Sequence, residues 1–141
     1  MTRRTAREHA FMALFAASFG QNVEDSIAAA REDDAEFPLD AFGEGLLHLY
    51  AGHAQHVDDT IEANLKGWRI GRLPRVNLAI LRLAVTEMTL GEAGMDSVVI
   101  NEAVELAKKY GADDDFQFIN GLLGSVSRAR GATAPEGAGE G

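Results

Sequence analysis

Apolar residues recur at three- and four-residue intervals along most of the chain, which is the spacing of one face of an α-helix. The clearest case is the segment 97–110, in which apolar and polar positions separate onto opposite sides of a helix. The apolar side consists of Val99, Ile100, Ala103, Val104, Leu106, Ala107 and Tyr110. The polar side consists of Asn101, Glu102, Glu105, Lys108 and Lys109. This pattern predicts an amphipathic helix with one side in the core.

The chain is expected to turn sharply where this helix ends. Lys108 and Lys109 occupy its last turn, where cations complement the negative end of the helix dipole, and Gly111 follows as the expected left-handed residue. The aspartates at 113–115 then supply an N-cap and negative charge for a further helix. The apolar stripe of that helix is Phe118, Ile119, Leu122, Leu123 and Val126.

The first helix is predicted from a capping box, in which Thr5 is followed three residues later by Glu8. This box starts the helix near Thr5 and leaves Arg3 and Arg4 on a mobile arm. Gly20 is expected to close the helix.

The middle of the chain carries further helical stripes. A short helix is expected at 23–31, and a longer one begins at Pro38 and bends at Gly52. Residues 64–73 interrupt the pattern as a loop before Pro74, which is expected to begin another helix. No segment has the sustained alternation of a strand. The sequence therefore predicts an all-α bundle of about six or seven helices.

Length and composition limit the organisation of the chain. With 141 residues, of which 46% are hydrophobic, it is large enough for one compact core, which we place at residues 3–129. The segment 130–141 is rich in glycine, alanine and glutamate, so we predict an acidic disordered tail. No apolar run is long enough to span a membrane, and no signal segment begins the chain, so we expect a cytoplasmic protein without membrane partners. The absence of cysteine excludes disulfides and thiolate sites.

The net charge of −9 would disfavour a nucleic-acid partner, but the charge is unevenly distributed. Residues 24–44 hold eight acids and one base, whereas three bases lie within positions 3–7. From Lys66 to Arg82 there are five bases and no acid. Either the surface has two electrostatic faces, or both runs are ordinary solvated surface; charge alone leaves both interpretations open.

Catalytic and metal sites find little support in the sequence. His53 and His56 are three residues apart on one predicted helical face, but zinc needs three or four convergent ligands, which favours two exposed histidines. Glu102 and Glu105 are one turn apart, and Lys108 on the same face favours a surface ion pair over a carboxylate catalyst. We therefore expect a protein that is not an enzyme and needs no metal or cofactor.

Binding of RNA has better support. Guanidinium groups pair with phosphates and stack on bases, so Arg3, Arg4 and Arg7 suit a single-stranded RNA; the alternative is a solvated arginine-rich helix end. Aromatic rings beside such bases can stack on nucleobases. The rings considered are Phe15, Tyr110, Phe116 and Phe118. Most are expected in the core, and Phe116 is expected to be more exposed than Phe118 because it breaks the apolar stripe.

Three blocks of this sequence resemble a known family. They are residues 100–111 (INEAVELAKKYG) followed by 118–123 (FINGLL), residues 3–10 (RRTAREHA), and residues 78–84 (LAILRLA) with Glu87. In this order they resemble the NusB family of bacterial transcription antitermination factors, over roughly residues 3–128. The resemblance implies two helical subdomains. It also implies binding of boxA RNA from ribosomal RNA transcripts together with NusE, a small-subunit ribosomal protein, within an antitermination complex on RNA polymerase.

The resemblance also implies site residues. The RNA contacts carried over are Arg3, Arg4, Arg7, Phe15, Lys108, Asp114, Phe118 and Asn120. NusE is expected on the helix that contains Asn77 and Arg82. Asn77 replaces an acid common in the family, and Phe15 replaces a frequent tyrosine. The acidic segment 24–44 would attract a basic partner such as a ribosomal protein. The alternative function is a helical protein-interaction module without RNA contact, with a homodimer possible.

Overall fold

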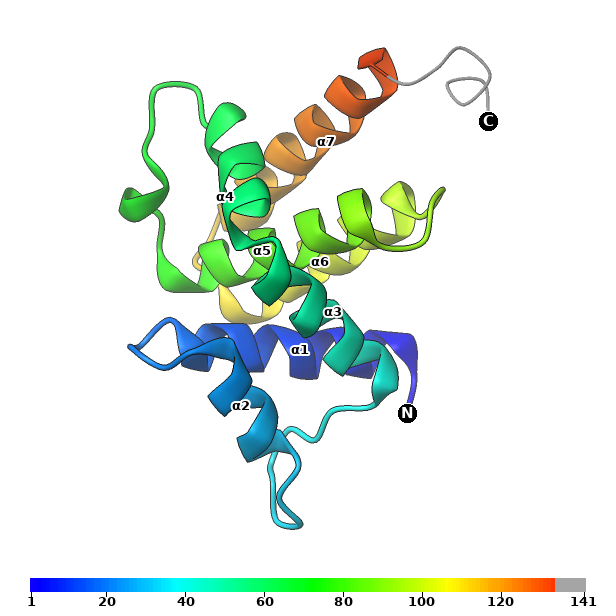
Figure 1. Cartoon of the computed structure of the whole chain (residues 1–141). Coiled ribbons are helices and arrows are strands. Elements are labelled where there is room, and N and C mark those ends of the chain that lie inside the picture. Colours follow the sequence, from blue (N-terminus) through cyan, green and yellow to red (C-terminus); the bar gives the residue numbers. More distant parts are fainter. Residues whose placement is uncertain (134–141) are drawn as a thin grey trace.

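The computed structural model describes residues 1–133, which form seven α-helices and one short 3-10 helix and contain no strand (Figure 1). The elements are α1 (Arg3–Ala17), α2 (Val23–Ala30), α3 (Ala41–Gly52), α4 (Ala54–Ala63), η1 (Ile70–Arg72), α5 (Arg75–Leu90), α6 (Asp96–Tyr110) and α7 (Asp115–Thr133). The predicted all-α fold is therefore confirmed. The helices expected at 23–31 and 97–110 lie within one residue of their predicted bounds.

Helix α5 is the centre of the bundle. It packs against α1 and α3 on one side and against α4, α6 and α7 on the other (Figure 1). From Ala79 to Met88 every residue of α5 except Arg82 is buried, so this helix has almost no solvent face. The helices α1–α3 pack on one another, and α7 packs on both α4 and α6, which gives two groups of helices that meet at α5.

Helix α1 begins earlier than its capping box predicts. The side-chain oxygen of Thr2 accepts a hydrogen bond from the backbone N–H of Thr5 at 3.1 Å, so Thr2 is the N-cap. Glu8 does not return to the helix start and instead contacts α6. Arg3 and Arg4 consequently lie in the first helical turn, and the predicted mobile arm is wrong. Thr2, three residues before Thr5, provides the cap that was predicted for Thr5 and so lengthens the helix at its start.

The long helix expected from Pro38 is two helices. Asp40 caps α3 by accepting a hydrogen bond from the N–H of Gly43 at 2.8 Å, so Pro38 lies before the helix rather than in it. His53 adopts a non-helical backbone with φ −135°, and it separates α3 from α4. The expected bend at Gly52 is thus a break one residue later. His53 and His56 do not share a helical face as the sequence suggested.

The corner between α6 and α7 depends on Gly111 for a different reason from the one predicted. Its φ is −88°, which is not left-handed. A Cβ at this position would lie 2.7 Å from the carbonyl oxygen of Ala107, so only glycine fits the close approach. Asp115 begins α7 and accepts a hydrogen bond from the N–H of Ala112 at 2.8 Å. Helix α7 passes the predicted boundary at 129, and the rest of the predicted tail, 134–141, lies outside the described residues.

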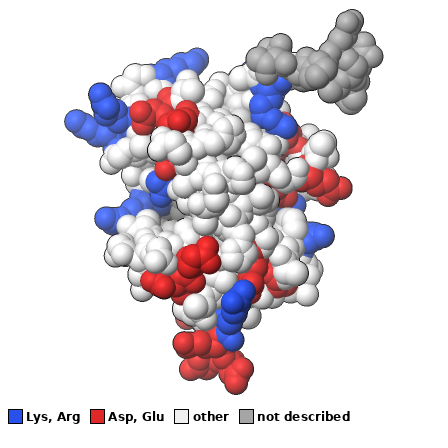
Figure 2. Space-filling view, in the orientation of Figure 1, with Lys and Arg blue, Asp and Glu red and all other residues white. Residues whose placement is uncertain are grey.

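Acidic and basic side chains gather at different places on the surface. Figure 2 shows acids at the tip of the connection between α2 and α3, and bases along the edge formed by the connection between α4 and α5. Within the described residues, no helix is long and apolar enough to cross a membrane.

Candidate functional site

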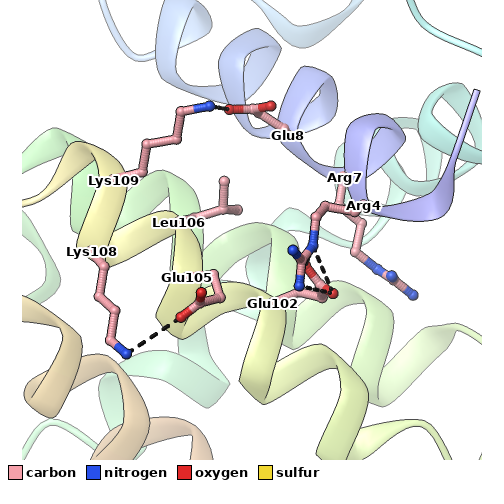
Figure 3. Close-up of a pocket in the computed structure, with 8 residues that line it drawn as sticks. All are labelled: Arg4, Arg7, Glu8, Glu102, Glu105, Leu106, Lys108 and Lys109. Atoms are coloured by element: carbon pink, nitrogen blue, oxygen red, sulfur yellow. Dashed lines mark hydrogen bonds and ion pairs between the residues drawn. The ribbon is translucent and has the colours of Figure 1, made fainter.

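A groove of about 370 Å³ separates α1 from α6, and we call it the α1–α6 groove (Figure 3). Its lining residues are Arg4, Arg7 and Glu8 from α1 and Glu102, Glu105, Leu106, Lys108 and Lys109 from α6. The groove thus contains four bases and three acids, and each of the two helices contributes both kinds. The groove joins two of the three blocks on which the family resemblance was based.

Arg4 is the most accessible base of this groove. Its Nε donates to Glu102 Oε2 at 3.0 Å, and its side chain remains 66% exposed. The hydrogen bond to Glu102 raises the pKa of the Arg4 guanidinium above its already high value. The pairing orients Arg4 along α6 while most of its guanidinium faces solvent, where a phosphate oxygen can replace the carboxylate.

Arg7 lies below the groove and is buried. Its Nε and Nη2 donate to Glu87 Oε1 and Oε2 at 2.8 and 2.7 Å, in a bidentate pair whose side chains are 7% and 5% exposed. The hydrogen bonds to Glu87 raise the pKa of Arg7. Two of the three guanidinium nitrogens are therefore engaged by Glu87, and little of the side chain reaches solvent. In this conformation Arg7 joins α1 to α5 and is not open to a phosphate.

Glu8, one turn after Arg4, connects α1 to the last turn of α6. Its Oε2 accepts a hydrogen bond from Lys109 Nζ at 2.6 Å and another from the hydroxyl of Tyr110. The hydrogen bond from Lys109, and after it the one from Tyr110, lower the pKa of Glu8. Burial and the bond to Glu8 raise the pKa of Tyr110. Tyr110 also packs against Phe11, with ring centroids 5.2 Å apart.

Lys108 extends from the last turn of α6 toward the corner. Its Nζ lies 3.4 Å from Glu105 Oε2 and 5.3 Å from the centre of the Phe116 ring. The predicted ion pair between Glu105 and Lys108 is confirmed. More than half of the Lys108 side chain is exposed, so the ammonium stays accessible from solvent.

The corner presents a different aromatic ring from the one predicted. Phe118 is 38% exposed, whereas Phe116 is half-buried against the core, so the predicted order of exposure is wrong. The reason is register: Phe116 lies three residues before the buried Ile119 and seven before the buried Leu123, on the inner face of α7. Asp114 and Asn120 are also exposed.

Two further predicted RNA contacts lie on α1. Phe15 is half-buried and packs between Phe11 and Phe19, with centroids 6.1 and 5.1 Å away. Arg3 is exposed, and its guanidinium lies 4.0 Å from the centre of the Phe42 ring. Arg3 therefore stacks on an aromatic face and keeps its donors directed at solvent.

The two predicted partner contacts on α5 differ in accessibility. Asn77 is 2% exposed, and its Oδ1 has no hydrogen-bond partner within the described part of the chain. Arg82 is partly exposed and forms a bidentate pair with Asp58 of α4, with both distances 3.0 Å. Only Arg82 of these two offers a surface to a partner. Asn77 was placed on the surface by resemblance, but it falls on the inner side of a helix that is buried on nearly all sides.

The two histidines considered as metal ligands do not converge on a site. His53 Nδ1 lies 2.9 Å from the carbonyl oxygen of Leu49, within hydrogen-bond distance at the end of α3. Among residues 1–133, no group of three or more histidine or acidic side chains is placed to hold a metal ion.

Comparison with known proteins assigns this chain to a family, and the match includes nearly all of the three sequence blocks described above. A family model described as the NusB family matches residues 4–128. The chain belongs to the NusB family. It is 36% identical over 126 residues to the transcription antitermination protein NusB of Bacillus mycoides strain KBAB4, a match that covers 89% of this chain and 97% of the relative. The corresponding protein of Streptomyces griseus is 40% identical over 126 residues, covering 86% and 88% of the two chains.

Solved NusB structures share this arrangement of helices. T. maritima NusB superimposes with a TM-score of 0.82 at 27% identity and covers 99% of this chain and 98% of its own. The chain is also similar to a protein in a solved complex of the antitermination factors NusB and NusE with dsRNA, with a TM-score of 0.73 at 27% identity and coverage of 90% and 96%. The resemblance inferred from three short sequence blocks is confirmed over nearly the whole chain.

The sequence did not reveal the ion pairs between α1 and α6 that the acids of this groove form. Glu102 was predicted as part of the polar face of its helix, yet it pairs with Arg4, which is 98 residues away in the sequence. The pairing of Arg7 with Glu87 left a signal in the sequence, since Arg7 precedes the buried Phe11 and Leu14 by four and seven residues. An arginine on that stripe is expected to need a buried carboxylate partner.

Proposed function

We propose that this protein is a transcription antitermination factor that binds boxA-type single-stranded RNA together with NusE and acts within an antitermination complex on RNA polymerase. Membership of the NusB family carries the proposal, and the solved complex of NusB and NusE with dsRNA supports it. The role needs binding surfaces and no catalytic step. Transcription in bacteria takes place in the cytoplasm, where we place the protein.

For the RNA, we assign exposed bases of the α1–α6 groove together with Arg3, which lies next to Arg4 in the sequence. Arg3 and Arg4 project from the first turn of α1, and Lys108 projects from the last turn of α6. Phosphate oxygens would replace Glu102 and Glu105 as partners of Arg4 and Lys108. The exposed side chains at the corner, Asp114, Phe118 and Asn120, are assigned as base contacts.

Two residues carried over from the family receive indirect roles. Arg7 fixes α1 against α5 through its buried pair with Glu87, and so sets the position of Arg4. Phe15 supports the α1 surface from within an aromatic row instead of offering a free face. Neither residue is assigned a direct RNA contact. A substitution of either one is therefore expected to lower the stability of the fold rather than to remove a single phosphate contact.

For NusE, we assign the surface formed by α4 and α5 around the Arg82–Asp58 pair. We assign no direct contact to Asn77, because its side chain is buried in the free chain. The acidic tip between α2 and α3, residues 32–36, adds negative potential that would accelerate association with a basic ribosomal protein.

The test is RNA binding across a range of salt, with and without NusE, for the wild type and for the double variant Arg3→Ala/Arg4→Ala. Each phosphate contact to a single strand contributes about 0.7 to the slope of log K against log salt, so the double variant should reduce the slope by about 1.4. Arg31→Ala is the matched control, because Arg31 is exposed, pairs with Glu44 and lies at the end of α2. An unchanged slope would reject these RNA residues, and absence of RNA binding by the wild type would favour the interaction module.

A further inference from the structure

The bases of this chain divide sharply into paired and unpaired groups. Seven of the 13 lysines and arginines form ion pairs: Arg4, Arg7, Arg31, Arg82, Lys108, Lys109 and Arg130. The other six have no carboxylate partner among the described residues, and they are Arg3, Lys66, Arg69, Arg72, Arg75 and Arg128. Three of these six, Lys66, Arg69 and Arg72, lie on the connection between α4 and α5, along the basic edge seen in Figure 2, and Arg75 begins α5.

This connection and α7 enclose a second groove of about 390 Å³, which we call the Trp68 groove. Lys66 and Trp68 form one wall, and Phe118 and Arg128 of α7 form the other. No acid lines it within the described part of the chain, whereas the α1–α6 groove holds three. The net charge of the chain is −9, so a groove lined by two bases and, among residues 1–133, by no acid has a more positive local potential than the surface as a whole.

Trp68 follows a tight turn of the backbone and is exposed. Gly67 has φ +82°, a left-handed conformation that side chains disfavour, and the N–H of Trp68 donates to the carbonyl oxygen of Leu65 at 2.9 Å. Trp68 is 64% exposed. Ser125 Oγ of α7 donates to Asn64 Oδ1 at 2.6 Å and joins the two walls at the base of the groove.

We propose that the Trp68 groove is a second contact for the same single-stranded RNA, with a nucleobase stacked on Trp68 and phosphates paired with Lys66 and Arg128. The inference rests on the proposed function. An exposed indole flanked by bases and polar groups, without an acid, matches the stacking surfaces that bind single strands. Phe118 lines this groove, and Phe116, on the opposite side of the first turn of α7, contacts Lys108 of the α1–α6 groove. Both grooves therefore border the corner between α6 and α7, over which one RNA strand would pass.

The first measurement uses the fact that Trp68 is the only tryptophan of the chain. Stacking of a base on the indole should quench its fluorescence as boxA-type RNA is added, in parallel with binding measured independently by a label on the RNA. NusE without RNA is added in a separate titration. If NusE quenches the fluorescence and RNA does not, the groove is a protein-docking surface and the proposal is overturned.

The second measurement uses variants of the groove. Loss of one stacked base by Trp68→Ala should weaken RNA binding roughly tenfold. Lys66→Ala/Arg128→Ala should reduce the salt slope by about 1.4. Arg31→Ala, on another face of the molecule, serves as the charge control and should leave the slope unchanged.

A third variant obstructs the groove without removing any contact. A Cβ at Gly121, which lines the groove, would meet nothing within 4 Å, so Gly121→Asp places a carboxylate in open space. It should weaken RNA binding severalfold while thermal unfolding stays near that of the wild type. If RNA binding depends on Arg3 and Arg4 but all the groove variants bind as the wild type does, this inference fails and the proposed function stands. If the wild type binds no RNA, the proposed function itself fails.

Discussion

The α1–α6 groove and the Trp68 groove have similar volumes and opposite electrostatic organisation. In the first, Arg4, Lys108 and Lys109 each pair with a glutamate, and Arg7 is held by Glu87 below the surface. In the second, Lys66 and Arg128 have no carboxylate partner among residues 1–133. The number of bases in a groove therefore says little about how readily it accepts a phosphate.

Pairing fixes the position of a base and also sets a competition. A phosphate that enters the α1–α6 groove must displace a carboxylate from Arg4 or Lys108, and the displaced acid then lies close to the phosphate. A phosphate that enters the Trp68 groove displaces only water and counterions. The first groove offers defined geometry, and the second offers unopposed charge beside a stacking surface.

The largest effect is expected from breaking the buried Arg7–Glu87 pair, which lies beneath the α1–α6 groove. Arg7→Ala leaves Glu87 buried without a partner, which should lower the free energy of unfolding by roughly 3–5 kcal/mol. Urea denaturation at neutral pH measures the change. Arg4→Ala, which removes an exposed pair on the same helix, should shift the midpoint only slightly.

The apolar double variant Arg7→Met/Glu87→Leu provides a second control for this pair. Because it removes both charges at once, it should recover most of the stability lost by Arg7→Ala. Equal midpoints for Arg7→Ala and Arg4→Ala would contradict a structural role for Arg7.

The corner between α6 and α7, which both grooves border, contains a glycine with no room for a side chain. Gly111→Ala places a Cβ 2.7 Å from the Ala107 carbonyl oxygen, which should destabilise the fold by roughly 1–3 kcal/mol as α6 and α7 shift. Gly121→Ala, in the following helix α7 and in open space, should be neutral or stabilising by up to about 1 kcal/mol. Thermal unfolding of the two variants side by side tests the contrast, which similar melting temperatures would refute.

Removing an acid should make the first groove resemble the second. Glu102→Gln frees Arg4 and eliminates a charge that opposes phosphate, so RNA should bind about threefold to fivefold more tightly at low salt. The gain should shrink as salt is raised. Glu44→Gln, which frees Arg31 instead, is the matched control and should leave RNA affinity unchanged. Unchanged affinity for Glu102→Gln would show that no phosphate approaches Arg4.

The smallest effect concerns Glu8, which joins α1 to the last turn of α6. Its pKa is lowered in the folded state below the ordinary 4.5 by hydrogen bonds from Lys109 and Tyr110. A depressed carboxyl pKa contributes stability that is complete above the ordinary pKa and disappears as the pH falls through the lower folded value. The melting temperature of Glu8→Gln should thus be slightly below that of the wild type at pH 7 and converge with it in acid. A difference that persists at the lowest pH would exclude an ionic origin.

The sequence alone determined the helices and the family. Apolar periodicity located α2 and α6 within a residue, and the ordered blocks in α1, α5, α6 and α7 identified the NusB family because local periodicity and motif order need no tertiary information. It also located the bases at 3–7 and 66–82 and the acids at 24–44. Helix starts were less accurate, since Thr2 and Asp40 compete with nearby residues for the same capping role.

Tertiary structure alone decided which charged and aromatic residues are available. Arg4 and Arg7 are three residues apart in one basic block, yet Arg4 is exposed and Arg7 is buried, because α5 supplies Glu87 from 80 positions away. The same packing exposes Phe118, buries Asn77 and brings Trp68 opposite α7. Contacts between residues distant in sequence depend on how the helices pack, and no local pattern specifies that packing.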